Sequence, residues 1–322
     1  MPRSKLIPYF EAGFAAVVWG ASFIATKVAL ADISPVAIVW LRFAMGVVIL
    51  GAAVAIRKEF ALPKKNEWGY FALLGFLGIT FHQWLQSNGL QTSEASTTAW
   101  IVATTPVFMA LLGWLVLKEK LSAVKVFGIA LAFAGVLLVV SDGDLASISV
   151  GKFGAPGDVL ILISSVNWAV FSALSRRGLK TYSASLMIFF VMSFGWLFTT
   201  VLFIGGGDYA ELPALTFNGW LGVIFLGVFC SGLAYIAWYD ALQVLSTAGT
   251  GVFLYIEPLI AMVVAFIVLD EAITVAALIG GAVILLGVWL VNKPSPQPSP
   301  AGRGNGEKVR KVESGAGESE AR

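Results

Sequence analysis

The sequence predicts an all-α integral membrane protein in which ten transmembrane helices form two inverted five-helix repeats, with the N and C termini cytoplasmic. Three observations predict this fold: the composition, an internal repeat and the distribution of basic residues. Hydrophobic residues make up 58% of the chain and charged residues 12%, whereas roughly 25% of residues are charged in soluble domains. Because this number of charges is too small to give a globule of this size a polar surface, we expect the chain to lie in the lipid bilayer.

The internal repeat relates two apolar segments of 60 residues. Residues 81–140 align without gaps with residues 233–292, and thirteen of the 60 aligned positions are identical. These segments lie in two halves of the chain that contain five expected helices each, and because five is odd, the second half must enter the membrane from the opposite side, as in inverted-repeat transporters. The matching pairs are Pro106 with Pro258, Glu119 with Glu271, Gly128 with Gly280 and Gly135 with Gly287 at an offset of 152 positions, and Trp19 with Trp168 and Lys27 with Arg176 at an offset of 149.

Ten apolar runs approach the length of about 20 residues that a helix needs to cross a bilayer. Short loops rich in Pro, Gly, Asp and Lys separate them, and these residues end helices. The expected spans are residues 10–30, 35–56, 68–89, 95–117, 122–140, 158–176, 185–204, 218–239, 247–269 and 273–291.

The spans divide the chain into five parts. We expect a cytoplasmic N-terminal segment, a first repeat, an outer loop, a second repeat and a disordered cytoplasmic tail, at residues 1–9, 10–141, 142–157, 158–292 and 293–322. The tail is expected to be disordered because it is polar and of low complexity. A cleaved signal peptide is the alternative for the N-terminus, but the first apolar run is too long and contains Glu11 and Lys27.

The basic residues set the orientation. Lys and Arg near helix ends are retained in the cytoplasm, and an inside N-terminus places 18 of the 21 basic residues on that side. The exceptions are Lys152 in an outer loop and Lys27 and Arg42 within helices.

Short motifs in both halves resemble one family. Trp19-Gly20-Ala21-Ser22-Phe23 with Lys27 and Arg42, followed by Pro106 leading to Leu117-Lys118-Glu119, resembles an EamA domain. Glu257-Pro258 leading to Leu269-Asp270-Glu271 resembles it again. Residues 10–292 are therefore similar to ten-helix members of the drug/metabolite transporter superfamily. The resemblance implies a carrier in the bacterial inner membrane that often exports amino acids or other small metabolites. The sixth helix departs from the pattern, with Ala169-Val170-Phe171 in place of Gly20-Ala21-Ser22.

Depth in the membrane selects a candidate substrate cavity. With a rise of 1.5 Å per residue, the midplane lies about ten residues into each helix. Inverted-repeat carriers bind their substrates at this depth, where the repeats meet. For the tryptophans, the alternative role is packing. For the threonines, it is a hydrogen bond to a backbone carbonyl that the following proline leaves without an N–H partner. The expected cavity residues are Trp19 and Ser22, Thr104 and Thr105, Asn167 and Trp168, and Tyr255 and Glu257.

Ionisable residues in these helices are further candidates, because a charge at mid-membrane costs about 2.5–3.5 kcal/mol on insertion scales. Glu257 is the deepest and is expected to carry a coupling proton, with a fixed pairing to Arg42 or Lys27 as the alternative. Arg42 is close enough to the outer boundary to reach it or to pair within the protein. If Arg42 and Lys27 face inward, they favour substrates with a carboxylate. His82 is expected to have a structural, hydrogen-bonded role rather than to relay protons.

Proline and small residues complete the expected frame. Pro106 and Pro258 each remove a backbone hydrogen bond and are expected to kink their helices into matched hinges. Small residues four positions apart, Gly128 with Ala132 and Ala277 with Gly281, allow close helix packing. That packing fits contacts within one subunit or a homodimer.

The function predicted from these features is secondary transport, with export expected, of small organic metabolites such as amino acids by alternating access. Coupling to a proton or another ion is expected, with no cofactor, metal or nucleic acid. The alternatives are a facilitative or exchange carrier for an organic anion or nucleotide-linked solute, and a membrane sensor or interaction protein. An intramembrane enzyme is disfavoured because the chain has one histidine, no paired histidine motif and no phosphate-binding loop.

Overall fold

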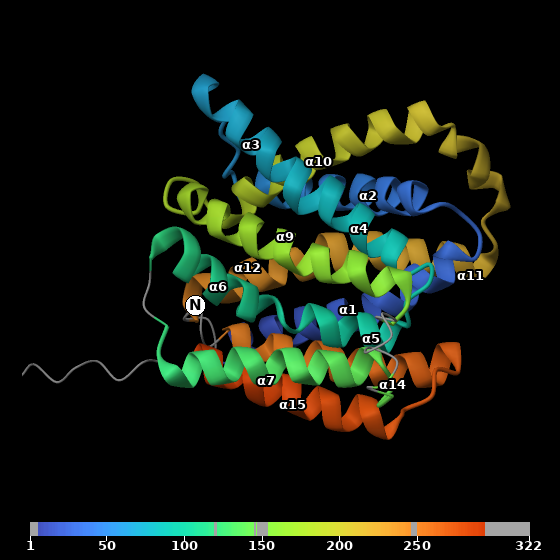
Figure 1. Cartoon of the computed structure of the whole chain (residues 1–322). Coiled ribbons are helices and arrows are strands. Elements are labelled where there is room, and N and C mark those ends of the chain that lie inside the picture. The colour runs from blue at the N-terminus through green and yellow to red at the C-terminus, as the bar shows by residue number, and fades with distance from the viewer. Residues whose placement is uncertain (1–5, 119–120, 145, 147–153, 246–249, 294–322) are drawn as a thin grey trace, which may run out of the picture.

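The computed structural model describes residues 6–118, 121–144, 146, 154–245 and 250–293, and every regular element in these ranges is helical. The expected tail, most of the N-terminal segment and much of the outer loop lie outside these residues, as does Glu119. In Figure 1 the helices form one bundle, with α7 and α15 along one side and α3 and α10 toward the other.

Nine helices in the described part of the chain are long and apolar enough to span a membrane. Their observed limits lie within a few residues of the expected ones for most spans. They are Ile7–Leu30 (α1), Pro35–Ile56 (α2), Ala95–Val116 (α5, Ala95–Val102, with most of α6, Thr105–Leu117), Ala123–Val140 (α7), Pro156–Gly178 (α9), Ala184–Gly206 (α10), Phe217–Val244 (α11, Phe217–Ile224, through α12, Ala234–Val244), Val252–Leu269 (η5, Val252–Ile256, with α14, Glu257–Leu269) and Val275–Asn292 (α15).

Two limits correct the expected boundaries. The first helix begins at Ile7, inside the expected N-terminal segment, and α9 begins at Pro156, inside the expected outer loop. Proline suits the first turn of a helix because its missing N–H would have no helical partner there. Pro156 therefore marks a helix start that hydropathy alone places two residues too late.

Residues 68–89 form a further continuous helical run. It consists of α3 (Trp68–Gly75), the π-helical segment Phe76–Phe81 and α4 (His82–Gly89). The last of these contains His82, Gln83 and Gln86, which lower the hydropathy of the run. It is therefore long enough to cross a membrane but less apolar than the nine helices.

Pro106 and Pro258 lie where the helical hydrogen-bonding pattern changes, and their role as hinges stays a prediction. Pro106 and Pro258 each occupy the first turn of a new helix, α6 and α14. A turn at residues 103–104 precedes α6, and the 3-10 segment Val252–Ile256 precedes α14. Each proline therefore begins a helix, where it leaves no hydrogen bond unmade.

Helix α7 packs along α15 (Figure 1). A Cβ on Gly128 would lie 2.7 Å from the carbonyl oxygen of Gly287, and a Cβ on Gly135 would lie 2.7 Å from that of Gly280. The backbones therefore touch, as small residues permit in membrane helices. Gly128 and Ala132 thus form a contact within one subunit, while Gly281 meets the ring of Trp100.

Gly128→Val should destabilise the protein by about 1–3 kcal/mol, because the added carbons must push two backbones apart. Thermal unfolding in detergent, followed by size-exclusion chromatography, would measure the loss. Gly205→Ala is the matched control, since no atom lies within 4 Å of its Cβ position. Equal melting temperatures for the two variants would contradict the contact.

Large apolar side chains cover the outside of the bundle. Leu197, Val201 and Ile204 on α10 are exposed, as are Leu278 and Leu286 on α15. A soluble monomer rarely exposes large contiguous apolar patches. The exposed side chains therefore fit a surface in contact with lipid.

Candidate functional site

Trp19 lies where α1 meets the helix that ends in α12. Its indole Nε1 donates a hydrogen bond to the carbonyl oxygen of Cys230 at 3.1 Å. Its ring packs on Tyr235 and Trp238, with centroid distances of 5.4 and 5.3 Å. The tryptophan is therefore oriented by one polar and two aromatic contacts.

Trp168, the repeat counterpart of Trp19, has a similar setting on α9. Its ring lies 4.6 Å from the imidazole of His82, measured between centroids. The neighbouring Asn167 donates through Nδ2 to the carbonyl oxygen of Leu77 at 2.8 Å. His82 is buried, and its Nδ1 lies 3.2 Å from the carbonyl oxygen of Ser164. These contacts tie α9 to the run that contains α4.

The carbonyls that bind Trp19 and Asn167 belong to two π-helical segments, Phe76–Phe81 and Phe225–Leu233. An offset of 152 positions carries the first segment onto residues 228–233, so the two are repeat counterparts. Such segments are rare and occur often at functional sites. Sequence reasoning missed them, because hydropathy carries no signal for a change of backbone hydrogen-bond register.

The hydroxyls of Ser22, Thr104 and Thr105 each bond to a backbone carbonyl three residues earlier. Ser22 donates to the carbonyl oxygen of Trp19 at 2.6 Å. Thr104 and Thr105 donate to the carbonyl oxygens of Ile101 and Val102 at 2.6 and 2.7 Å. The threonines thus donate hydrogen bonds to carbonyls just before Pro106, as expected for the structural alternative to a role in the cavity. Their oxygens can still accept a hydrogen bond.

Tyr255 is directed away from the two tryptophans. Its hydroxyl accepts a hydrogen bond of 2.7 Å from Nδ2 of Asn292 at the end of α15, and its ring packs on the core formed with α7. The structure therefore does not bring Tyr255 together with the other expected cavity residues.

Glu257 is the first residue of α14, which lies beside α1. A Cβ on Gly20 would lie 2.7 Å from the backbone carbonyl oxygen of Glu257. The residue is half-buried. Within the described ranges its carboxylate forms neither a hydrogen bond nor an ion pair, so the expected pairing with Arg42 or Lys27 is not observed. The first turn of a helix favours a negative charge, which suits a carboxylate at this position.

Arg42 is 5% exposed and does not extend to lipid. Its Nε donates to Oγ of Ser231, and its Nη1 donates to Oε1 of Gln83, both at 3.1 Å. The guanidinium also lies 5.1 Å from the ring centroid of Phe43. Gln83 is the repeat counterpart of Tyr235, the residue on which Trp19 packs.

Lys27 belongs to a separate cluster at one end of the bundle, which we call the latch: Lys27, Ser93, Ala95, Ser96 and Glu271. The Lys27 Nζ donates to the carbonyl oxygen of Ser93 at 2.8 Å and lies 3.5 Å from Oε1 of Glu271. The Glu271 carboxylate accepts from the N–H groups of Ala95 and Ser96 at 2.8 and 3.0 Å, and from the Ser96 hydroxyl at 2.8 Å. The latch joins α1, the start of α5 and the turn after α14.

Glu94 immediately precedes α5 without capping it. Burial, together with the nearby Glu271 carboxylate, raises the pKa of Glu94 above its ordinary value. The end of the bundle that holds the latch therefore keeps two acidic residues, Glu94 and Glu271, close together.

Arg57 and Asp240 form an ion pair at the opposite end of α2. Two hydrogen bonds of 2.7 and 2.6 Å join them, and Arg57 also donates to Oγ of Ser185 at 3.2 Å. Bonding to Asp240 raises the pKa of Arg57 above its ordinary value. Sequence reasoning did not select Asp240, since its position near the end of an apolar run resembles an ordinary helix terminus.

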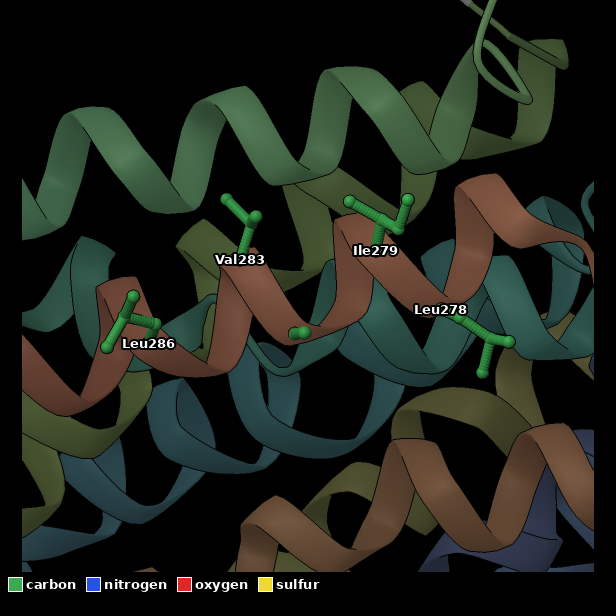
Figure 2. A pocket seen from close by; sticks show the side chains of 5 residues that line it. Leu278, Ile279, Val283 and Leu286 are labelled. Carbon is green, nitrogen blue, oxygen red and sulfur yellow. The ribbon is translucent and has the colours of Figure 1, made fainter.

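A groove of about 370 Å³ lies on the surface of α15, away from these residues (Figure 2). Its lining is entirely aliphatic: Leu278, Ile279, Ala282, Val283 and Leu286. The groove contains none of the expected cavity residues and offers no polar group to orient a solute. We therefore place the candidate site around Trp19, Arg42, Trp168 and Glu257 rather than in this groove.

Comparison with known proteins identifies relatives. Residues 8–141 and 155–293 each match the model of the EamA-like transporter family. An uncharacterized transporter from Archaeoglobus fulgidus is 29% identical over 281 residues, covering 87% of this chain and 96% of the relative. A protein from Streptantibioticus cattleyicolor named "Probable terminal-alkyne amino-acid exporter" is 26% identical over 283 residues, covering 86% and 90%.

A crystal structure has the same fold, with a TM-score of 0.62 at 20% sequence identity, over 89% of this chain and 96% of its own. The apolar helices and the related transporters together make the chain a multi-pass integral membrane protein, consistent with the bacterial inner membrane. With two matches that cover most of its length, the chain belongs to the EamA-like transporter family.

Proposed function

We propose that this protein is a secondary transporter that moves small organic metabolites by alternating access between two inverted five-helix repeats. Ten helices would cross the membrane, including residues 68–89, and both termini would be cytoplasmic. The two repeats would comprise residues 10–141 and 158–292. Membership of the family supports transport in general, and the proposal adds the mechanism.

One observation supports the inverted repeat above all others, the pairing of glycines between α7 and α15. Gly128 meets Gly287, and Gly135 meets Gly280. In the repeat alignment, Gly128 corresponds to Gly280 and Gly135 corresponds to Gly287. Replacing each glycine by its counterpart therefore converts the Gly128–Gly287 contact into the Gly135–Gly280 contact. A two-fold axis between the helices has this property, and an axis lying in the membrane plane relates inverted repeats.

Unequal burial of repeat counterparts supports alternating access. Trp100 in α5 is 2% exposed, whereas its counterpart Val252, in the segment before α14, is 58% exposed. Ile101 is buried and its counterpart Phe253 is half-buried. Counterparts in a two-state carrier exchange environments between its states. The latch contacts fit a state closed at that end of the bundle, which the basic residues predict to face away from the cytoplasm.

Amino acids are the proposed substrate class, and export is the proposed direction. The relative from Streptantibioticus cattleyicolor carries the name of an amino-acid exporter. The candidate site also combines aromatic rings with separate basic and acidic groups, which suits a small zwitterion. Glu257 would carry the coupling proton, because its carboxylate has no hydrogen-bond partner in the described ranges.

Transport in proteoliposomes tests this function. The protein would be reconstituted and supplied with pooled radiolabelled amino acids, with or without an imposed pH gradient. We expect accumulation that depends on the gradient and disappears with a protonophore. Protein-free liposomes are the control, and accumulation no greater than theirs for every amino acid would contradict the proposal.

A further inference from the structure

We propose that Arg42 is the anion-binding residue of the transport site, and that the transported solute presents a free carboxylate to its guanidinium. This inference rests on the proposed transport function and deepens it by naming the group that recognises the solute. It requires an arginine that is buried, lacks a permanent acidic partner and has hydrogen-bond donors to spare.

Arg42 is buried without a compensating charge from the described residues. The ion pairs found there join Lys27 to Glu271 and Arg57 to Asp240. The acceptors bonded to Arg42 are the neutral oxygens of Ser231 and Gln83. A buried charge is normally paired or bound to a ligand. An anionic solute would provide the missing negative charge.

The two neutral partners hold the guanidinium in place. Ser231 lies within the π-helical segment Phe225–Leu233, and Gln83 lies two residues after the segment Phe76–Phe81. The guanidinium is therefore fixed from both repeats. Preorganisation of this kind strengthens binding, because little motion remains to be lost when a ligand arrives.

Spare donors remain on the Arg42 guanidinium. It carries five N–H groups, of which one on Nε and one on Nη1 have the partners described above. Nη2 has no hydrogen-bond partner among the described residues, and it is not among the fully enclosed polar atoms that lack one. The N–H groups on Nη1 and Nη2 can form the paired bonds that a carboxylate accepts from arginine.

The surroundings indicate where the rest of the solute would lie. Tyr235 follows Ser231, the partner of Arg42, by four residues, and Trp19 packs on its ring. Gly20, the neighbour of Trp19, lies against the backbone of Glu257. A solute bound to Arg42 by its carboxylate would therefore lie along Tyr235 and Trp19, with Glu257 beyond. A positively charged amino group of the solute could then face the Glu257 carboxylate.

Matched pairs of solutes test this proposal in proteoliposomes. L-Leucine and L-phenylalanine would each be compared with the corresponding carboxamide, which keeps the side chain and amino group but lacks the carboxylate. For the wild type we expect at least tenfold faster protein-dependent movement of at least one acid than of its amide. Arg42→Lys, which keeps the charge but loses the paired N–H groups of the guanidinium, should lower that preference at least fivefold. Gln83→Ala should weaken it less.

The outcomes separate this proposal from the proposed function. Acid and amide moving equally fast in the wild type would overturn the role of Arg42 while leaving transport intact. An Arg42→Lys protein with the wild-type preference would do the same. If neither member of any pair moves, both the proposed amino-acid transport and the carboxylate site fail. The wild-type comparison requires no variant, so misfolding of Arg42→Lys could not mask the result.

Discussion

Glu257→Gln should abolish the accumulation of solute that a pH gradient drives, while exchange of solute across the membrane without a gradient persists. Glutamine has nearly the size of glutamate and resembles its protonated form, but it cannot release a proton. A carrier with glutamine at this position would still bind solute. It would no longer link solute movement to proton movement.

The size of the effect follows from the setting of the carboxylate. A charge near mid-membrane costs about 2.5–3.5 kcal/mol, and Glu257 has no ionic partner among the described residues to offset this cost. The carboxylate therefore needs a proton or a positively charged solute group during the transport cycle. We expect at least a tenfold loss of gradient-driven accumulation, measured with the reconstituted protein.

Glu94→Gln is the matched control, because it removes an acid from the latch end of the bundle, outside the candidate site. Its accumulation should stay near that of the wild type. Persistent gradient-driven accumulation in Glu257→Gln would assign coupling to another group and leave Glu257 a structural role.

Glu271→Ala should open the latch end of the bundle. The substitution removes the acceptor of the first N–H groups of α5 and the anionic partner of Lys27. Loss of a helix cap costs about 1 kcal/mol, and loss of a partly exposed ion pair costs about 0–1 kcal/mol. A shift of one to two kcal/mol changes a two-state equilibrium roughly 5–30-fold.

Thiol labelling would measure this opening. A Ser22→Cys reporter on α1 lies five residues before Lys27, and the single native cysteine, Cys230, is buried and should react little. In right-side-out vesicles, an impermeant thiol reagent should label the reporter several-fold faster with Glu271→Ala than without it. Glu94→Ala, which removes an acid that makes no capping bond, should leave the labelling rate unchanged. Equal rates for Glu271→Ala and the unaltered latch would contradict its closing role.

Most helix limits could be predicted because apolar runs and their capping residues are local signals. The span expected at residues 35–56 is observed as Pro35–Ile56, where Ser34 accepts from the N–H of Ala37 and Pro35 occupies the first turn. Kinks were expected at Pro106 and Pro258, and the structure places each proline in the first turn of a helical segment, an outcome that proline in an apolar run also allows. Only the surrounding backbone decides between a kink and a new helix.

The candidate site was less predictable, because its contacts join residues distant in the sequence. Repeat alignment and depth selected Trp19 and Trp168, but depth could not show that Tyr255 faces Asn292. Arg42 was noticed as a charge, yet its partners Gln83 and Ser231 lie 41 and 189 positions away. Alignment paired Glu271 with Glu119, which gave no hint that Lys27 is its neighbour in space.

The segment Phe76–Phe81 also fixes the rotational phase of everything that follows it in its helix. A π-helical turn takes in an extra residue, and each residue of a helix turns the chain by about 100°. Deleting one residue there would restore α-helical register and swing Gln83 away from Arg42 and His82 away from Trp168. The helix would shorten by only about 1.5 Å. The face that α4 presents to the site therefore depends on one inserted residue, a change that hydropathy would not register.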